Sequence, residues 1–296
     1  MRTLIKVLSF QFFLLLLLFS PIRAEKLSLK VSLNTNSIAH EDINNWIDSY
    51  NSLWTDWQTL HGGQLEGEFL PLKYGSSYEV EVRIPVVYGF GLLFGGTQIS
   101  SQASGRIAYD TSAGNQREVQ AISNRIEALP LKIGLCYRIE LIPRLSLTAS
   151  VGRHIVFVKY QTEEDYEAVF ISQGQNFSYW YEKDITFNSE ALGLFASVGA
   201  EFELFKFLAV VLEAEQTWNS VDGFKGSYSM NNYLGQEEKG KASLYYYESK
   251  EFGLDNFYPV LTGHKEKPEG VNVRNVRQGE LNFDGISAKI GIRLKF

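Results

Sequence analysis

Apolar and polar residues alternate strictly along the C-terminal end of the chain, from Ile286 to Phe296. A period of two predicts a β-strand, because successive side chains of a strand point to opposite faces. One face of this predicted strand is wholly apolar, whereas the other carries the cations Lys289, Arg293 and Lys295. The run is long enough to cross a bilayer as one tilted strand, which takes about 9–11 residues.

The same alternation recurs along the chain, and the connections between the runs follow a regular order. The alternating runs lie at residues 27–33, 78–84, 129–138, 145–152, 192–203 and 208–215, with a less regular, glycine-containing run at 88–99. Short connections near 85–88, 139–144 and 204–207 alternate with long ones at roughly 35–76, 100–125, 158–188 and 217–280. Tight turns that alternate with large loops are typical of barrels that span an outer membrane.

These runs predict an all-β fold, a transmembrane antiparallel up-and-down β-barrel with long external loops. Eight strands are the simplest count, and the length of the long connections leaves ten or twelve open. An even number would put both ends of the chain on the periplasmic side. A soluble sandwich also alternates, but every run here has small or charged residues on its polar face, as a barrel in lipid requires.

The polar faces of the predicted strands carry acids and cations in equal number. A barrel of eight strands is narrow and filled by side chains, and unpaired charges inside it would be costly. We therefore predict a lumen plugged by ion pairs, with a narrow ion pathway as the alternative. The predicted lumen residues are Glu79, Glu81, Arg83, Lys132, Arg138, Glu201, Glu203, Glu213, Glu215, Lys289, Arg293 and Lys295.

The N-terminal segment has the layout of a secretory signal peptide. Arg2 and Lys6 precede an apolar stretch that ends at Phe19, and Ala24 follows a short polar region. The apolar stretch is shorter than the ~20 residues of a spanning helix, although a retained anchor is the alternative. We therefore expect cleavage near Ala24, with residues 1–24 as the signal peptide and 25–296 as the barrel domain.

Composition and charge narrow the function classes. A pI of about 5.4 and a net charge of −6 argue against nucleic acid as a partner. The single cysteine, Cys136, excludes a disulfide framework and a multi-cysteine metal site. We expect neither a metal nor a cofactor. The chain is 14% aromatic at a mean hydropathy of −0.13, as expected of strands with only one face in lipid.

The signal peptide, the strand pattern and the final K-I-G-I-R-L-K-F together resemble small outer-membrane barrels of Gram-negative bacteria, such as the OmpA, OmpX and OmpW families. The resemblance implies location in the outer membrane and contact with its lipids. It also implies that Phe296, a terminal aromatic on the last strand, is the signal read by the barrel-assembly machinery. The long connections exceed what such small barrels usually have.

The long connections hold the remaining candidate sites. Apolar residues at 3–4 residue spacing predict an amphipathic helix over about 41–60, ended by Gly62. One alternative places this helix in the membrane interface. The other places it across or inside the barrel mouth, and only in that position would Trp46, Trp54 and Trp57 line a ligand site. The aromatics of 177–181 and 245–258 fit either external binding surfaces or hairpin extensions of the barrel.

Signals for catalysis are weak. The four histidines form no metal-binding pair, and only His154 has a serine, Ser150, four residues earlier on its strand face. A polar lumen pair explains these two residues more simply than a nucleophile does. We therefore predict a non-enzymatic barrel that uses its external loops for surface contact or for binding an unknown solute. A narrow channel for small or hydrophobic solutes is the second hypothesis, and a lipid-modifying enzyme is the third.

Overall fold

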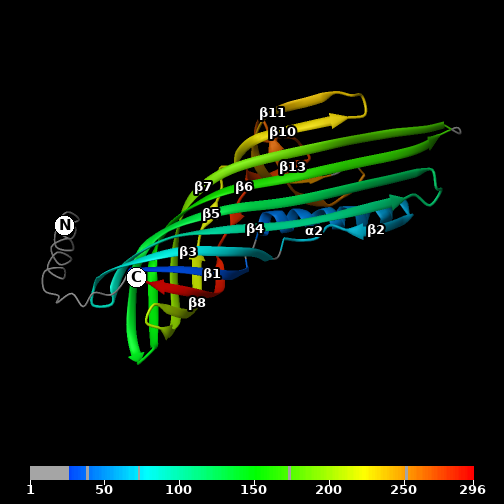
Figure 1. Cartoon of the computed structure of the whole chain (residues 1–296). Helices are drawn as coiled ribbons and strands as arrows, with labels where there is room; N and C mark the ends of the chain where they lie inside the picture. Colours follow the sequence, from blue (N-terminus) through cyan, green and yellow to red (C-terminus); the bar gives the residue numbers. More distant parts are fainter. Residues whose placement is uncertain (1–26, 38–39, 73, 173–174, 251–252) are drawn as a thin grey trace.

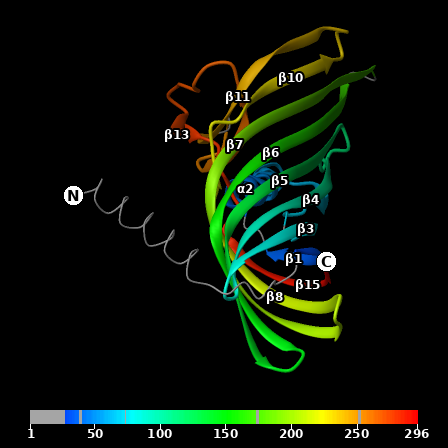
Figure 2. The ribbon, with the colours of Figure 1, turned by 60° about the vertical axis from the view of Figure 1, so that its left-hand side comes forward.

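The chain folds into an antiparallel β-barrel whose strands close into a ring (Figures 1 and 2). The computed structural model describes residues 27–37, 40–72, 74–172, 175–250 and 253–296, so the predicted signal peptide lies outside the described residues. Each strand pairs with the next along the ring, and the ring closes where the first strand pairs with the last. The ring strands are β1 (Ser28–Ser37), β3 (Tyr74–Val87), β4 (Phe90–Asp110), β5 (Gln116–Ile142), β6 (Leu145–Ser172), β7 (Gln175–Phe205), β8 (Leu208–Trp218) and β15 (Gly285–Lys295).

The barrel wall turns apolar residues outward and polar residues inward. On β7, Leu192 and Val198 of the outward face are 69% and 64% exposed, whereas Glu201 of the inward face is 0% exposed. The same contrast separates Ile290 from Lys289 on β15. A soluble protein shows the opposite arrangement. An apolar exterior on a closed ring is the surface that hydrocarbon requires, because the ring leaves no unpaired strand edge.

The predicted long loops at 100–125 and 158–188 are wrong, because most of these residues continue the strands. β5, β6 and β7 contain 27, 28 and 31 residues, far more than the ~9–11 that cross a bilayer. Beyond Phe157 the alternation continues with its faces exchanged, so that Val158 and Tyr160 are buried on the inner side and Glu163 is exposed on the outer side. The apolar outer face therefore ends near Phe157. Beyond it the outward residues are mainly charged, so the sequence no longer shows the alternation of a membrane-spanning strand.

The extended strands form one wall of a second folded region, which we call the outer lobe. The N-terminal half of β7, from Tyr181 to Asn188, pairs with β10 (Lys225–Asn232). The sheet continues through β11 (Glu237–Lys250), which pairs with β10. Both β12 (Phe257–His264) and β13 (Val273–Gln278) pair with β11. The predicted loop at 217–280 is thus largely folded. The outer lobe also contains β2 (Gln64–Glu68), which pairs with the end of β4, and the short pair β9 (Ser220–Val221) and β14 (Leu281–Asn282).

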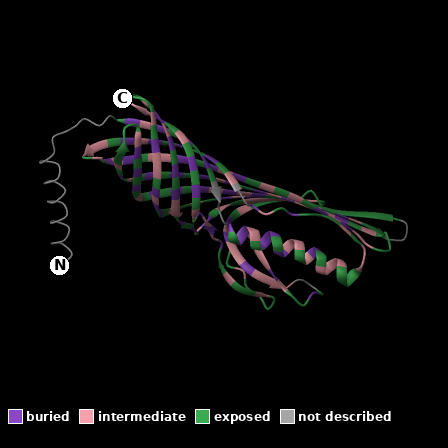
Figure 3. Ribbon diagram, turned by 90° about the horizontal axis from the view of Figure 1, so that it is seen from below, coloured by how far each residue is buried: buried purple, intermediate pink, exposed green. Residues whose placement is uncertain are grey.

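The predicted amphipathic helix is confirmed as α2 (Glu41–His61), which lies beyond the end of the barrel (Figure 3). Its apolar side, including Ile43 and Ile47, packs into a core with the inner faces of the extended strands, among them Tyr160 and Phe187. Gly62 ends the helix with a positive φ of 71°, which favours glycine. Among the described residues, no helix is long and apolar enough to span a bilayer.

The C-terminus lies at the end of the barrel away from the outer lobe (Figure 3). The turns at this end are short, and they join β3 to β4, β5 to β6, and β7 to β8, as the sequence predicted. The tight turns and the outer lobe therefore lie at opposite ends of the barrel.

Candidate functional site

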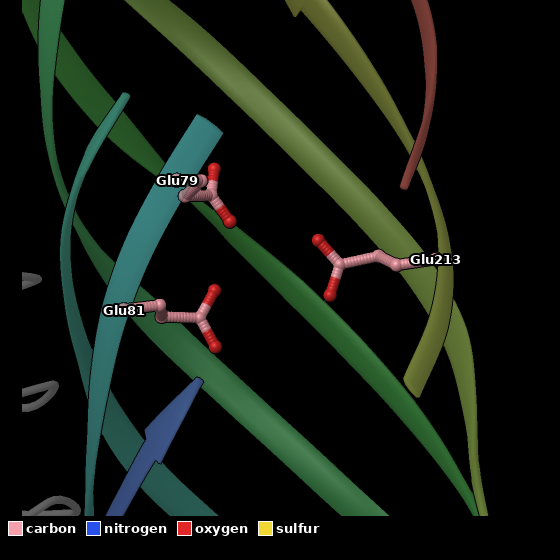
Figure 4. Close-up of side chains that lie close together, drawn as sticks. All are labelled: Glu79, Glu81 and Glu213. Atoms are coloured by element: carbon pink, nitrogen blue, oxygen red, sulfur yellow. The ribbon is translucent and has the colours of Figure 1, made fainter. Parts of the chain in front are cut away.

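The centre of the barrel holds one lysine among three carboxylates. The ammonium Nζ of Lys30 lies 3.0 Å from Glu79 Oε1, 2.9 Å from Glu81 Oε2 and 3.0 Å from Glu213 Oε2. The Lys30 side chain is 0% exposed. Glu79 and Glu81 project from the same face of β3, and Glu213 points toward them from β8 on another part of the wall (Figure 4). This cluster spans the lumen from wall to wall.

A second group of pairs adjoins the cluster on the side of the outer lobe. Lys132 Nζ lies 2.6 Å from Glu79 Oε2, and Lys289 Nζ lies 2.7 Å from the same oxygen. Both lysines also contact Glu215, which is 2.8 Å from Lys289. Because Glu79 is shared by Lys30, Lys132 and Lys289, the two groups form one network.

The network continues toward the opposite end of the barrel. Arg293 bridges two carboxylates, at 3.1 Å from Glu81 and 3.1 Å from Glu201. Lys295 contacts Glu201 at 2.5 Å, and Arg138 contacts Glu203 at 3.1 Å. Arg83 joins the network through Glu81 at 2.6 Å. The structure therefore joins all the lumen residues derived from the sequence into one connected network of ion pairs.

Lys30 is the network residue that sequence reasoning left out. It lies on the polar face of the first alternating run, between Leu29 and Val31, so the pattern alone could have included it. With Lys30, the described network holds seven cations and six carboxylates.

Glu79, Glu81 and Glu213 also have the arrangement of a metal site, with one carboxylate oxygen of each within 4.8 Å of the others. The Lys30 ammonium is within hydrogen-bonding distance of all three, so it already supplies the positive charge at their centre. A divalent ion would have to displace a buried ammonium that has no other carboxylate partner within 4 Å among the described residues. The three carboxylates are therefore a poor fit for a metal.

Two cavities flank the network. The smaller, about 40 Å³, faces the outer lobe and is lined by residues that include Lys132, His154, Thr217 and Phe283. A water occupies about 10–15 Å³ by this measure, so the cavity can hold only a few. The larger, about 220 Å³, lies at the other end beside Arg138 and residues such as Glu203, Lys206 and Lys295.

His154 pairs with Asn219 rather than with Ser150. Its Nε2 lies 3.1 Å from Asn219 Nδ2, and its ring stacks on Phe195 with 6.3 Å between centroids. The Nδ1 of His154 and the hydroxyl of Ser150 are both buried without a hydrogen-bond partner among the described residues. Within the described part of the chain, a serine–histidine–carboxylate relay is therefore not assembled around this histidine.

The tryptophans of α2 lie in the outer lobe and not in the barrel lumen. Trp46 and Trp54 are buried in the core of the lobe, and Trp54 Nε1 donates a 3.0 Å hydrogen bond to Gln120 Oε1 on β5. Trp57 packs against that core and against the ring of His61, 4.3 Å away between centroids. Packing of the lobe accounts for the positions of all three.

Phe296 lies at the end of β15, and its side chain is exposed. Its backbone N–H donates a 2.9 Å hydrogen bond to the carbonyl of Leu27, which joins the two ends of the barrel domain. The aromatic ring is therefore free to contact lipid or another protein.

The fold and its interior define a class of protein: a transmembrane β-barrel with an ion-paired lumen and a folded lobe at one end. No family model and no curated protein matches the chain. Among solved structures, it is similar to the outer membrane protein OprG from Pseudomonas aeruginosa, with 9% identity, a TM-score of 0.38, and coverage of 92% of this chain and 96% of that one. It is also similar to the outer membrane protease OmpT from Escherichia coli, with 8% identity, a TM-score of 0.26, and coverage of 92% and 94%.

Proposed function

We propose that the chain is a non-enzymatic outer-membrane barrel whose lumen is plugged by ion pairs and whose outer lobe makes contacts outside the cell. The observation that carries this proposal is the buried cluster of Lys30 with Glu79, Glu81 and Glu213. Lipids of the outer membrane would cover the apolar wall, and the barrel-assembly machinery would recognise the last strand with Phe296.

The energetics of the cluster favour a plug over a pore. An ion moving through the lumen would have to separate Lys30 from its carboxylates or pass between them. Each contact is close to 3.0 Å, where opposite charges attract by roughly 5 kcal/mol at an effective dielectric constant of 20. Three such contacts converge on one ammonium, so an ion that displaced it would have to break all three at once.

The outer lobe is the part suited to binding. From residue 158 to residue 172, β6 runs about 45 Å beyond the apolar wall at ~3.3 Å per residue. Its outer face is mainly charged, and its inner face contributes to the apolar core that includes α2, as in a soluble domain. We infer that any specific contact outside the membrane is made by this lobe.

A channel for small or hydrophobic solutes is the second candidate. The cavities at the two ends of the network favour it, because they would become its vestibules if the central pairs opened. An enzymatic role has less support, since among the residues that the structure describes His154 has neither a carboxylate nor a serine as a partner.

Planar-bilayer conductance of the refolded chain separates these candidates. We expect no reproducible ion-selective step from the native sequence, and frequent openings from Lys30→Met, which removes the central ammonium. Lys225→Met makes the same chemical change on β10 of the outer lobe and should behave like the native protein. A regular ion-selective step from the native protein would overturn the plugged lumen.

A further inference from the structure

Four tyrosines gather on the outer lobe. Tyr166 of β6 stacks on Tyr181 of β7 with 5.3 Å between ring centroids. Tyr179 lies 6.0 Å from Tyr166 and 5.0 Å from Tyr233, which comes from the turn between β10 and β11. Tyr179 and Tyr233 are 40% and 46% exposed as residues, so a ligand can reach them. We call these four residues the tyrosine cluster.

Two carboxylates lie behind the rings. The hydroxyl of Tyr166 donates a 2.6 Å hydrogen bond to Glu118 Oε2, and that of Tyr181 donates a 2.7 Å hydrogen bond to Glu164 Oε1. The remaining donors to these carboxylates are neutral amides, from Gln116 to Glu118 and from Gln120 to Glu164.

Neither carboxylate forms an ion pair among the described residues. Glu118 is 8% exposed, and it has only the neutral donors just described. Lys183 lies opposite Glu164 in the strand pairing, but its ammonium donates to Thr262 instead, at 3.1 Å. A buried carboxylate without a cation is costly, and in this chain the lumen carboxylates all have one.

The hydrogen bonds also strengthen the faces of the rings. Burial and the neighbouring carboxylates raise the pKa of both Tyr166 and Tyr181, so these phenols stay protonated and donate. A phenol that donates to a carboxylate gains electron density on its ring. Electron-rich rings attract cations more strongly, and the two negative charges behind them act in the same direction.

We propose that the tyrosine cluster binds an organic ammonium cation, held between the exposed residues Tyr179 and Tyr233 and the half-buried, electron-rich rings of Tyr166 and Tyr181. The uncompensated charge of Glu118 distinguishes this from a site for a neutral sugar, which would need aromatic faces but no net negative charge. This inference rests on the binding role proposed for the outer lobe and names its ligand class. It does not depend on whether the lumen conducts.

Calorimetric titration with choline tests the proposal on the refolded full chain, in a maltoside detergent that has no ammonium headgroup. The neutral isostere 3,3-dimethylbutanol has the same shape as choline without its charge. We expect saturable binding of choline and at least about tenfold weaker binding of the isostere. Equal binding of the two compounds, or no binding of choline, would overturn the proposal.

Variants locate the site. Glu118→Gln and Tyr179→Ala should each weaken choline binding by about tenfold or more. Glu167→Gln removes a carboxylate from the opposite, exposed face of β6 and should leave choline binding unchanged. If Glu118→Gln fails to fold, Tyr233→Ala in the exposed turn takes its place. Native-like binding by Tyr179→Ala and Tyr233→Ala would refute this location, and a conducting lumen would leave these results unaffected.

Discussion

Replacing Lys30 by methionine should strongly destabilise the barrel. The substitution keeps an unbranched side chain, one atom shorter, but removes the ammonium that contacts Glu79, Glu81 and Glu213 within 3.0 Å. The three carboxylates then face one another, with oxygens within 4.8 Å. At an effective dielectric constant of 20, each pair of charges at that distance repels by roughly 3 kcal/mol. Removing one partner of a buried ion pair usually costs about 3–5 kcal/mol, and we expect a loss in this range.

Urea unfolding of the protein in lipid vesicles, followed by tryptophan fluorescence and by gel mobility without boiling, measures this loss. The double variant Lys30→Met/Glu213→Gln should recover part of the stability, because it removes one of the three carboxylates that repel one another in the single variant. Lys225→Met should change the free energy of unfolding by less than about 0.5 kcal/mol, as exposed substitutions usually do. A loss below about 1 kcal/mol for Lys30→Met would show that the ammonium does not hold the carboxylates together.

Two further predictions concern the ends of the barrel. His40 is buried, and burial lowers its pKa from 6.5 to about 4. It therefore stays neutral when folded, and stability present at neutral pH is lost as the pH falls from about 6.5 to about 4, by roughly 3 kcal/mol in total. Unfolding midpoints across this range should depend less on pH in His40→Leu, and an unchanged dependence would contradict the assignment. Deleting Phe296 should reduce membrane assembly, measured as the heat-modifiable fraction in outer membranes, and native levels of that fraction would refute a role in assembly.

The barrel could be predicted from the sequence because lipid imposes the same outward face on every strand. Leu192 and Ile290 are apolar for that reason, whatever their neighbours in the sheet. The outer lobe could not be predicted in the same way. Beyond Phe157 the outer face meets water, so the alternation changes phase, and short stretches on either side of the change resemble loops.

The contacts between residues in the barrel interior could not be predicted from the sequence, for a different reason. The alternation shows which residues lie on the polar face of each strand, so the members of the lumen network could be predicted. The same rule would have included Lys30. Which cation meets which carboxylate depends on ring closure. Lys30 reaches Glu213, 183 positions away, because β15 lies between their strands. In the same way, the helical spacing identified the buried face of α2, but the bond from Trp54 to Gln120 depends on the extension of β5.

The exchange of faces along β4 to β7 bears on how the two halves of the molecule act together. The same four strands bury small, polar or charged side chains inside the barrel and mainly apolar side chains inside the outer lobe. The hydrogen bonding between β6 and β7 runs without a break from Leu145 to Ser172. A continuous ladder of this kind leaves no hinge between the halves. The outer lobe is therefore held in a fixed orientation on the barrel. A ligand at the tyrosine cluster would meet a rigid, preformed surface, and binding would require little ordering of the chain.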